Sequence, residues 1–188
     1  MPDPVATAAA ALRRGALVVY PTDTLVGLGA SARNARAVDR LLAAKGRPSG
    51  MPISVAVASH EEVEPWVDWD SSARAVARQL LPGPVTLLVY ASPRARRELA
   101  PSVLGPNSTI GIRVPDHPVP RELARRVGPI TSTSANRHGD PPVASLAEAR
   151  RAFRDTVSVY VPLRPPPSGA PSMIVDLKGD EPRYVERR

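Results

Sequence analysis

Short apolar runs rich in β-branched residues recur along the chain, and they constrain its fold more than any other feature. Each run has the length of a strand and is closed by proline, glycine or a small polar residue, which is typical of strands in a sheet. Segments with apolar residues at helical spacing separate the early runs. The expected strands cover residues 16–20, 53–58, 85–90, 109–114, 157–161, 173–177 and 183–185.

Two of the expected helices begin at strong capping residues. Asn34 precedes a helix that ends at Lys45, and Ser145 precedes a helix in which Glu148 has the position of a capping box. Further helices are expected over residues 6–14, 71–80, 93–99 and 121–127, the second of them capped by Ser71 or Ser72.

Helices and strands alternate early in the chain, whereas strand follows strand later. This order predicts an α/β fold, with a twisted sheet of mixed parallel and antiparallel strands that is open and flanked by helices. The length of 188 residues predicts a single domain over residues 1–188.

Composition limits the classes of function. The formal net charge of +7 favours anionic partners such as nucleotides or RNA. The chain has no cysteine, which excludes disulfides, thiolate catalysis and thiolate metal sites. No segment has the apolar length of a signal peptide or of a membrane span. We therefore expect a cytoplasmic protein with no membrane partner.

Several common motifs are missing from the sequence. It contains no P-loop and no Gly-x-Ser-x-Gly elbow, and the Gly-Leu-Gly at 27–29 lacks the third glycine of a dinucleotide fingerprint. His60, His117 and His138 are dispersed and are expected on the surface or in loops, without a metal. Any catalysis is therefore expected to depend on positioning and electrostatics.

The segment 45–48 stands out because Lys45 is one of only two lysines in a chain that otherwise uses arginine. A compact ammonium two residues from the planar guanidinium of Arg47 can bind a carboxylate or carbonate beside a polyphosphate. The alternative explanation is an ordinary charged helix end with a stop at Pro48. As part of a helix end, the Lys45 ammonium is expected to be partly solvated.

Four hydroxyl-rich loops lie beside expected strands. Hydroxyl, amide and backbone N–H groups bind phosphate and carboxylate oxygens well, although one such loop alone is more typical of a turn or cap. Together with Lys45, Arg47 and Arg113, the four loops favour an anion-binding cleft. They cover residues 21–24, 108–109, 131–136 and 168–172.

Ordered blocks of sequence resemble the YrdC/YciO-like family over nearly the whole chain. The blocks are Tyr20–Ala30, Lys45–Pro48, Leu81–Thr86, Gly111–His117, Thr133–Asn136 and Ser172–Asp176. Their order is far more specific than any single block. The resemblance implies the short, single-domain form of the family, with an α/β fold and a positively charged cleft.

The best-known activity of the family is threonylcarbamoyl-AMP synthase, and the resemblance implies the same activity here. L-threonine, bicarbonate and ATP would give threonylcarbamoyl-adenylate and pyrophosphate, as the first step of a tRNA adenosine modification. Mg²⁺ would be carried by ATP, without a metal site of the protein. Downstream tRNA-modification proteins would be further partners.

The resemblance also implies roles for individual residues. Lys45 and Arg47 would be catalytic, with Lys45 facing bicarbonate or the carbamate. The ATP contacts would be Arg47, Thr109, Arg113, Ser134 and Asn136. The threonine contacts would be Thr24, Ser132 and Ser172.

Some positions depart from the family pattern, mainly on the threonine side and among secondary ATP contacts. Arg187 could replace a missing C-terminal arginine only if the strand register slipped by one residue, which would turn its side chain to the other face. The departures are Val26 for tyrosine, Met51 for asparagine, Ala56 for histidine, Met173 for threonine and Glu186 for arginine.

Two alternatives stay open. The chain could be a diverged paralogue that adenylates a different carbamoylated substrate. It could also be an RNA-binding module whose basic cleft holds tRNA or double-stranded RNA without chemistry.

Overall fold

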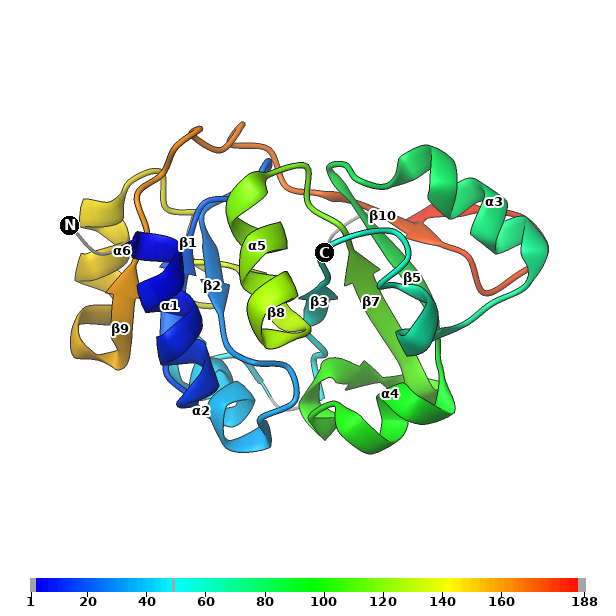
Figure 1. The fold of residues 1–188 in the computed structure, drawn as a ribbon, viewed down its shortest axis with the longest axis horizontal. Coiled ribbons are helices and arrows are strands. Elements are labelled where there is room, and N and C mark those ends of the chain that lie inside the picture. Colours follow the sequence, from blue (N-terminus) through cyan, green and yellow to red (C-terminus); the bar gives the residue numbers. More distant parts are fainter. Residues whose placement is uncertain (1–2, 49, 186–188) are drawn as a thin grey trace.

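The fold is a twisted sheet of parallel and antiparallel strands, with helices around it (Figure 1). The computed structural model describes residues 3–48 and 50–185. The strands lie in the order β11-β10-β5-β7-β3-β8-β2-β1-β9, while the short β4 and β6 pair with β5 and β7. The predicted α/β fold with a mixed open sheet is confirmed. The strands are β1 Leu17–Tyr20, β2 Gly27–Gly29, β3 Ser54–Ala56, β4 Val67–Asp68, β5 Val85–Ala91, β6 Leu104–Gly105, β7 Thr109–Arg113, β8 Ile130–Ser134, β9 Val157–Tyr160, β10 Met173–Asp176 and β11 Arg183–Val185.

The helices lie close to their predicted positions. Asn34 Oδ1 accepts a hydrogen bond from the backbone N–H of Ala37 at 3.0 Å, and Ser145 Oγ accepts one from that of Glu148 at 3.2 Å. Both predicted caps are therefore confirmed. The helices are α1 Pro4–Arg13, α2 Ala35–Lys45, α3 Ser71–Leu80, α4 Pro93–Glu98, α5 Pro118–Val127 and α6 Leu146–Phe153.

Two predictions about helix starts are wrong. The cap of α3 is Asp70 and not Ser71 or Ser72, because the Asp70 carboxylate accepts a hydrogen bond from the backbone N–H of Ala73 at 2.8 Å. Helix α5 begins earlier than expected, at Pro118, since a proline at the first helical position sacrifices no hydrogen bond. His117 caps it from the loop between β7 and α5, which is one of the two expected positions, but the residue is buried and not on the surface.

Strands β2 and β8 were not expected from the sequence, and β8 occupies most of the segment 131–136 that was expected as a hydroxyl-rich loop. Strand β2 is the Gly-Leu-Gly segment at 27–29. Its two glycines are explained by Tyr20 on the neighbouring strand β1. A Cβ atom at Gly29 would lie 2.6 Å from a ring carbon of Tyr20, and one at Gly27 would lie 3.0 Å from the ring. Tyr20 in turn donates a hydrogen bond from its hydroxyl to the carbonyl of Thr131 at 2.9 Å. The Gly-Leu-Gly segment therefore makes room for a buried aromatic ring.

Alternation along β7 separates the apolar core from the polar face of the sheet. Ile110 and Ile112 belong to the core, so Thr109, Gly111 and Arg113 point to the opposite face. Helices α1 and α5 cover part of that face, where they pack against β1, β3 and β8. The part beyond these helices carries the pockets described below. Within the described residues, no helix is long and apolar enough to cross a bilayer.

Candidate active site

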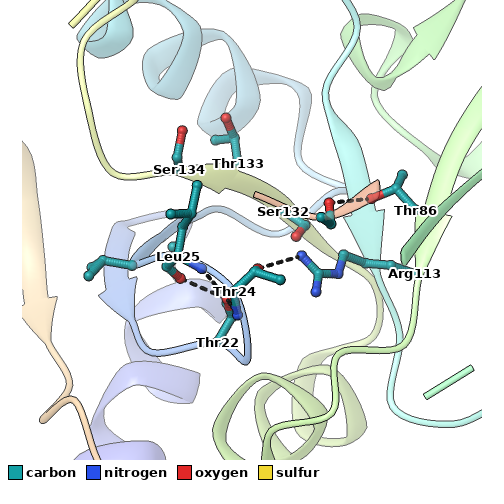
Figure 2. Close-up of a pocket in the computed structure, with 11 residues that line it drawn as sticks. Thr22, Thr24, Leu25, Thr86, Arg113, Ser132, Thr133 and Ser134 are labelled. Atoms are coloured by element: carbon teal, nitrogen blue, oxygen red, sulfur yellow. Dashed lines mark hydrogen bonds between the residues drawn. The ribbon is translucent and has the colours of Figure 1, made fainter. Parts of the chain in front are cut away.

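A small pocket rich in hydroxyl groups lies where the β1–β2 loop meets β7 and β8 (Figure 2). We call it the hydroxyl pocket. Its cavity volume is about 30 Å³, so the groups around it lie close together. It is lined by Thr22, Thr24, Leu25, Val26, Gly27, Thr86, Arg113, Ser132, Thr133, Ser134 and Ser172.

A chain of hydrogen bonds orients the hydroxyl of Thr24 in this pocket. Arg113 donates from Nη1 to Thr24 Oγ1 at 3.2 Å, and the hydroxyls of Thr24 and Thr22 lie 3.0 Å apart (Figure 2). The Thr22 hydroxyl donates to the carbonyl of Leu25 at 2.7 Å, which uses its only proton. The proton between the two threonines therefore comes from Thr24. Thr24 faces the pocket with a free lone pair, as a hydrogen-bond acceptor.

The charge of Arg113 is compensated inside the protein. Its Nη2 donates to Asp23 Oδ1 at 2.7 Å, and the residue is only 4% exposed. Burial lowers the pKa of the Arg113 guanidinium, while the Asp23 carboxylate acts in the opposite direction. Within the described residues, Arg113 Nε and Asp23 Oδ2 are buried without a hydrogen-bond partner. An orphaned donor and an orphaned acceptor thus lie next to the pocket.

Two further hydroxyls connect this pocket to β5 and β10. Ser172, immediately before β10, lies with its Oγ 3.0 Å from Thr86 Oγ1 on β5. Both residues are buried. Ser132 faces the same space from β8 (Figure 2). The predicted threonine contacts Thr24, Ser132 and Ser172 are therefore brought together.

A wider pocket adjoins the hydroxyl pocket and shares Thr86, Ser132 and Thr133 with it. We call it the central cleft. Its cavity volume is about 230 Å³, and apolar side chains form one part of its wall. Gly111 lines this cleft without a side chain, and a Cβ atom at its position would lie only 2.7 Å from Ser54 Oγ. The remaining lining residues are Arg47, Pro52, Ile53, Ser54, Leu88, Ile174 and Val185.

Arg47 lies at the edge of the central cleft. Its Nε donates to the carbonyl of Met51 at 3.1 Å and its Nη2 to that of Pro52 at 3.0 Å. Burial lowers the pKa of its guanidinium. In the described part of the chain its other donors have no hydrogen-bond partner, and no carboxylate neutralises it. Arg47 can therefore bind an anion without releasing the two carbonyls.

Lys45 is buried, against the expectation of a partly solvated helix end. It is 3% exposed, and its ammonium donates to the carbonyls of Ser134 at 2.5 Å and Asn136 at 2.6 Å. Burial lowers the pKa of Lys45 to about 8, with a smaller contribution from the charge of Arg47. Its side chain lines neither pocket. In this structure Lys45 fixes the backbone of two predicted ATP contacts.

The remaining predicted ATP contacts are dispersed. Ser134 lines the hydroxyl pocket, whereas Thr109 and Asn136 line neither pocket. Thr109 is buried at the start of β7, on the same face of the sheet as Arg113 but at the far end of the strand. Asn136 donates from its amide to the carbonyls of Arg137 and Asp140, while its Oδ1 is buried and unpaired among the described residues.

The departures from the family pattern fall in different environments. Val26 lines the hydroxyl pocket, and Ala56 is fully buried in the core formed with α1 and α5. Met51 supports Arg47 with its carbonyl. Met173 is 47% exposed and lines neither pocket. Glu186 and Arg187 lie outside the described residues.

The sequence did not identify Thr22, Asp23 and Thr86 as members of the site. Thr22 and Asp23 belong to the first hydroxyl-rich loop, which was expected to line the cleft, but only Thr24 in that loop was given a role of its own. Thr86 is the polar residue of an otherwise apolar run, Val85–Tyr90, and a polar residue within a buried strand could have indicated it.

Comparison with known proteins decides the family. The chain matches the Sua5/YciO/YrdC family model, described as "Telomere recombination", over residues 10–188. The chain belongs to the Sua5/YciO/YrdC family. It is 40% identical over 187 residues to a threonylcarbamoyl-AMP synthase of Chromohalobacter salexigens, covering 95% of each chain. It is 38% identical to that of Thiobacillus denitrificans, covering 88% of this chain and 87% of the relative.

A solved structure of the family agrees with the fold. The chain superposes on the crystal structure of P. abyssi Sua5 complexed with L-threonine with a TM-score of 0.85 and 29% identity. The match covers 97% of this chain and 53% of the Sua5 chain. This chain therefore corresponds to about half of that protein.

Proposed function

We propose that the chain is an ATP-dependent threonylcarbamoyl-AMP synthase, which makes threonylcarbamoyl-adenylate and pyrophosphate from L-threonine, bicarbonate and ATP. The observation that carries this proposal is a pair of adjoining pockets of different character. The hydroxyl pocket is small and charge-compensated, whereas the central cleft is wider and carries the uncompensated charge of Arg47. The names of the relatives and of the threonine-bound structure support the same assignment.

In this proposal L-threonine occupies the hydroxyl pocket. Thr24, Ser132 and Ser172 hold it, and the orientation of Thr24 makes that residue an acceptor for an N–H or O–H group of the amino acid. Arg113 fixes this orientation, because its Nη1 occupies one lone pair of the Thr24 hydroxyl. A zwitterionic amino acid suits a pocket whose buried charges already sum to zero.

ATP occupies the central cleft. The apolar side chains of Leu88 and Ile174 provide a surface for the base, and Arg47 binds the phosphates. The Asp23 carboxylate is paired with Arg113, and the described residues contain no group of three or more His, Cys, Asp or Glu side chains that could hold a metal ion. Mg²⁺ would therefore be held by phosphate oxygens and water and would bind together with ATP.

The reaction requires two bond-forming steps in close succession. The threonine nitrogen attacks the carbon of bicarbonate, and water is lost to give a carbamate. A carbamate oxygen then attacks the α-phosphorus of ATP, and the bond to the bridging oxygen breaks to release pyrophosphate. Arg47 stabilises the charge that moves to the leaving group. Lys45 holds the Ser134 and Asn136 backbone, and its positive charge interacts with that of Arg47.

Pyrophosphate release with ATP, Mg²⁺ and bicarbonate, measured with and without L-threonine, tests this proposal. We expect release to depend on threonine and to stop when bicarbonate is removed. Absence of threonine-dependent release at high protein concentration would contradict it. Stimulation by another amino acid instead would indicate the paralogue with a different substrate, for which Val26 is an altered position that lines the hydroxyl pocket. RNA binding without turnover would indicate the RNA-binding module.

The product would be consumed by downstream tRNA-modification proteins in the cytoplasm. The net charge of +7 suits contact with tRNA or double-stranded RNA as well as with ATP.

A further inference from the structure

A buried histidine outside both pockets makes two hydrogen bonds that define its chemical state. His117 is 2% exposed. Its Nδ1 accepts from the backbone N–H of Val119 at 3.1 Å and therefore carries no proton. Its Nε2 lies 3.1 Å from the carbonyl of Pro165, which is an acceptor, so Nε2 carries the proton and donates it. The ring is neutral and both nitrogens are used.

Pro165 belongs to the segment between β9 and β10, residues 162–172, which we call the strap. The strap crosses from β9 on the left of Figure 1 to β10 on the right, in orange. Most of its residues are exposed, so few apolar contacts hold it in place. Its course depends on polar contacts.

The strap is tied to the β1–β2 loop beside the hydroxyl pocket. Ser168 donates from its backbone N–H to the carbonyl of Asp23 at 3.2 Å, and Gly169 donates to that of Thr24 at 2.8 Å. The strap ends at Ser172, which enters the hydroxyl pocket. Two of the three predicted threonine contacts, Thr24 and Ser172, therefore depend on where the strap lies.

We propose that His117 is a positioning residue for the threonine site. Its hydrogen bond to the carbonyl of Pro165, which we call the latch, holds the strap at the start of α5 and so sets the positions of Thr24 and Ser172. The inference rests on the proposed function, because it assigns threonine to the hydroxyl pocket. His117 touches neither pocket and acts only through the strap. Its loss is therefore expected to weaken threonine binding more than ATP binding.

Two substitutions separate the latch from the helix cap. In His117→Asn, the amide oxygen can replace Nδ1 as the cap of α5, but the side chain is too short to reach Pro165. In His117→Gln, the amide nitrogen can replace Nε2 and keep the latch, while the cap on Val119 is lost. Gln therefore serves as the matched control for Asn.

Amide hydrogen exchange and steady-state kinetics of the full chain provide the readouts. We expect His117→Asn to speed exchange at Ser168 and Gly169 and to raise the KM for threonine about fivefold, as for the loss of one hydrogen bond, with kcat and the KM for ATP within about twofold of wild type. His117→Gln is expected to leave both the strap exchange and the threonine KM close to wild type, and to speed exchange at Val119.

The inference is overturned if His117→Asn leaves strap exchange unchanged, or if it raises the KM values for threonine and ATP equally. It is also overturned if His117→Gln impairs threonine binding more than His117→Asn, because the effect would then follow the helix cap. If the wild-type chain shows no threonine-dependent turnover, the proposed function fails. In that case the exchange measurement alone decides whether His117 holds the strap.

Discussion

The two cationic ends of the site differ in how their charges are balanced. At the hydroxyl pocket, Arg113 forms a buried ion pair with Asp23 and uses a second donor to orient Thr24. At the central cleft, the hydrogen bonds of Arg47 within the described residues go to backbone carbonyls, which carry no net charge. Lys45, whose side chain lines neither pocket, likewise donates to two carbonyls. One end is therefore neutral overall and the other is cationic.

This difference suits the two substrates that we propose. A neutral, hydroxyl-lined pocket recognises a zwitterion by the direction of its hydrogen bonds, without a strong attraction for any anion. A cationic end with unused donors attracts a polyphosphate. Sequence order alone does not distinguish the two ends, because each contributes an arginine next to hydroxyl groups. The two ends differ because Arg113 is paired with a carboxylate, whereas Arg47 binds neutral carbonyls.

Removal of Arg113 is expected to have the largest effect. Arg113→Met leaves the Asp23 carboxylate with no cationic partner, which should lower the free energy of unfolding by about 3–5 kcal/mol and abolish threonine-dependent turnover. Urea unfolding and pyrophosphate release are the measurements. The double variant Asp23→Asn, Arg113→Met should recover most of the stability without the activity. If the double variant is no more stable than Arg113→Met, the pair is not the source of the loss.

Arg47→Ala is expected to weaken ATP binding and to lower turnover, while threonine binding is retained. Loss of a charged contact to phosphate should cost about 2–3 kcal/mol, which raises the KM for ATP roughly 30- to 150-fold. The KM for threonine and the stability should change little, because the two carbonyl partners of Arg47 can be hydrated. Arg97→Ala, on the exposed side of α4, is the control for loss of one positive charge. Equal changes in the two KM values would contradict the separation of the two ends.

Lys45→Ala is expected to lower both turnover and stability. Lys45 is buried, and its ammonium joins the end of α2 to the backbone of Ser134 and Asn136, so its removal should also destabilise the fold. We expect a loss of about 1–3 kcal/mol in the free energy of unfolding, measured by urea titration. Lys45→Met keeps the aliphatic part of the side chain and should separate packing from hydrogen bonding. Wild-type stability in both variants would show that the two contacts do not support this loop.

The smallest expected effect is a dependence of stability on pH that arises from His117. Burial lowers the pKa of His117, while the carbonyl of Pro165 and the carboxylates of Asp23 and Asp116 act in the opposite direction. The unfolded chain, with an ordinary histidine pKa of about 6.5, therefore binds a proton more readily than the folded chain. Stability should fall as the pH decreases from about 6.5 towards the lowered pKa.

Thermal unfolding between pH 7 and pH 5 measures this dependence. His117→Asn, which has no titrating group at this position, should show a shallower decrease than wild type. An equal decrease in both proteins would assign the dependence to other groups.

The fold could be predicted from the sequence wherever local signals were strong. The apolar runs and the Asn34 and Ser145 caps gave strands and helices in their observed places. Strand β2 was missed because two glycines leave no apolar alternation, and their reason is the ring of Tyr20 on another strand. Such a packing reason is not visible in the local sequence.

The sequence predicted which types of residue form the site, but not which of them are joined by hydrogen bonds or ion pairs. Arg113 and Asp23 are separated by 90 positions, and Lys45 is separated from Ser134 by 89. Hydrogen bonds over such separations depend on the folded topology, so the sequence could not show that Lys45 binds the carbonyls of Ser134 and Asn136. The buried state of His117 was missed for the same reason, since its Nε2 partner lies on a distant loop.

The salt dependence of binding tests the central claim most directly. Calorimetric titrations with L-threonine and with Mg²⁺-ATP, each at low and at high salt, compare the two ends in one protein. The claim that one end is charge-compensated and the other is not predicts that the Kd for threonine changes by less than about twofold, while that for ATP rises by about tenfold or more. A threonine affinity as sensitive to salt as that of ATP would contradict it.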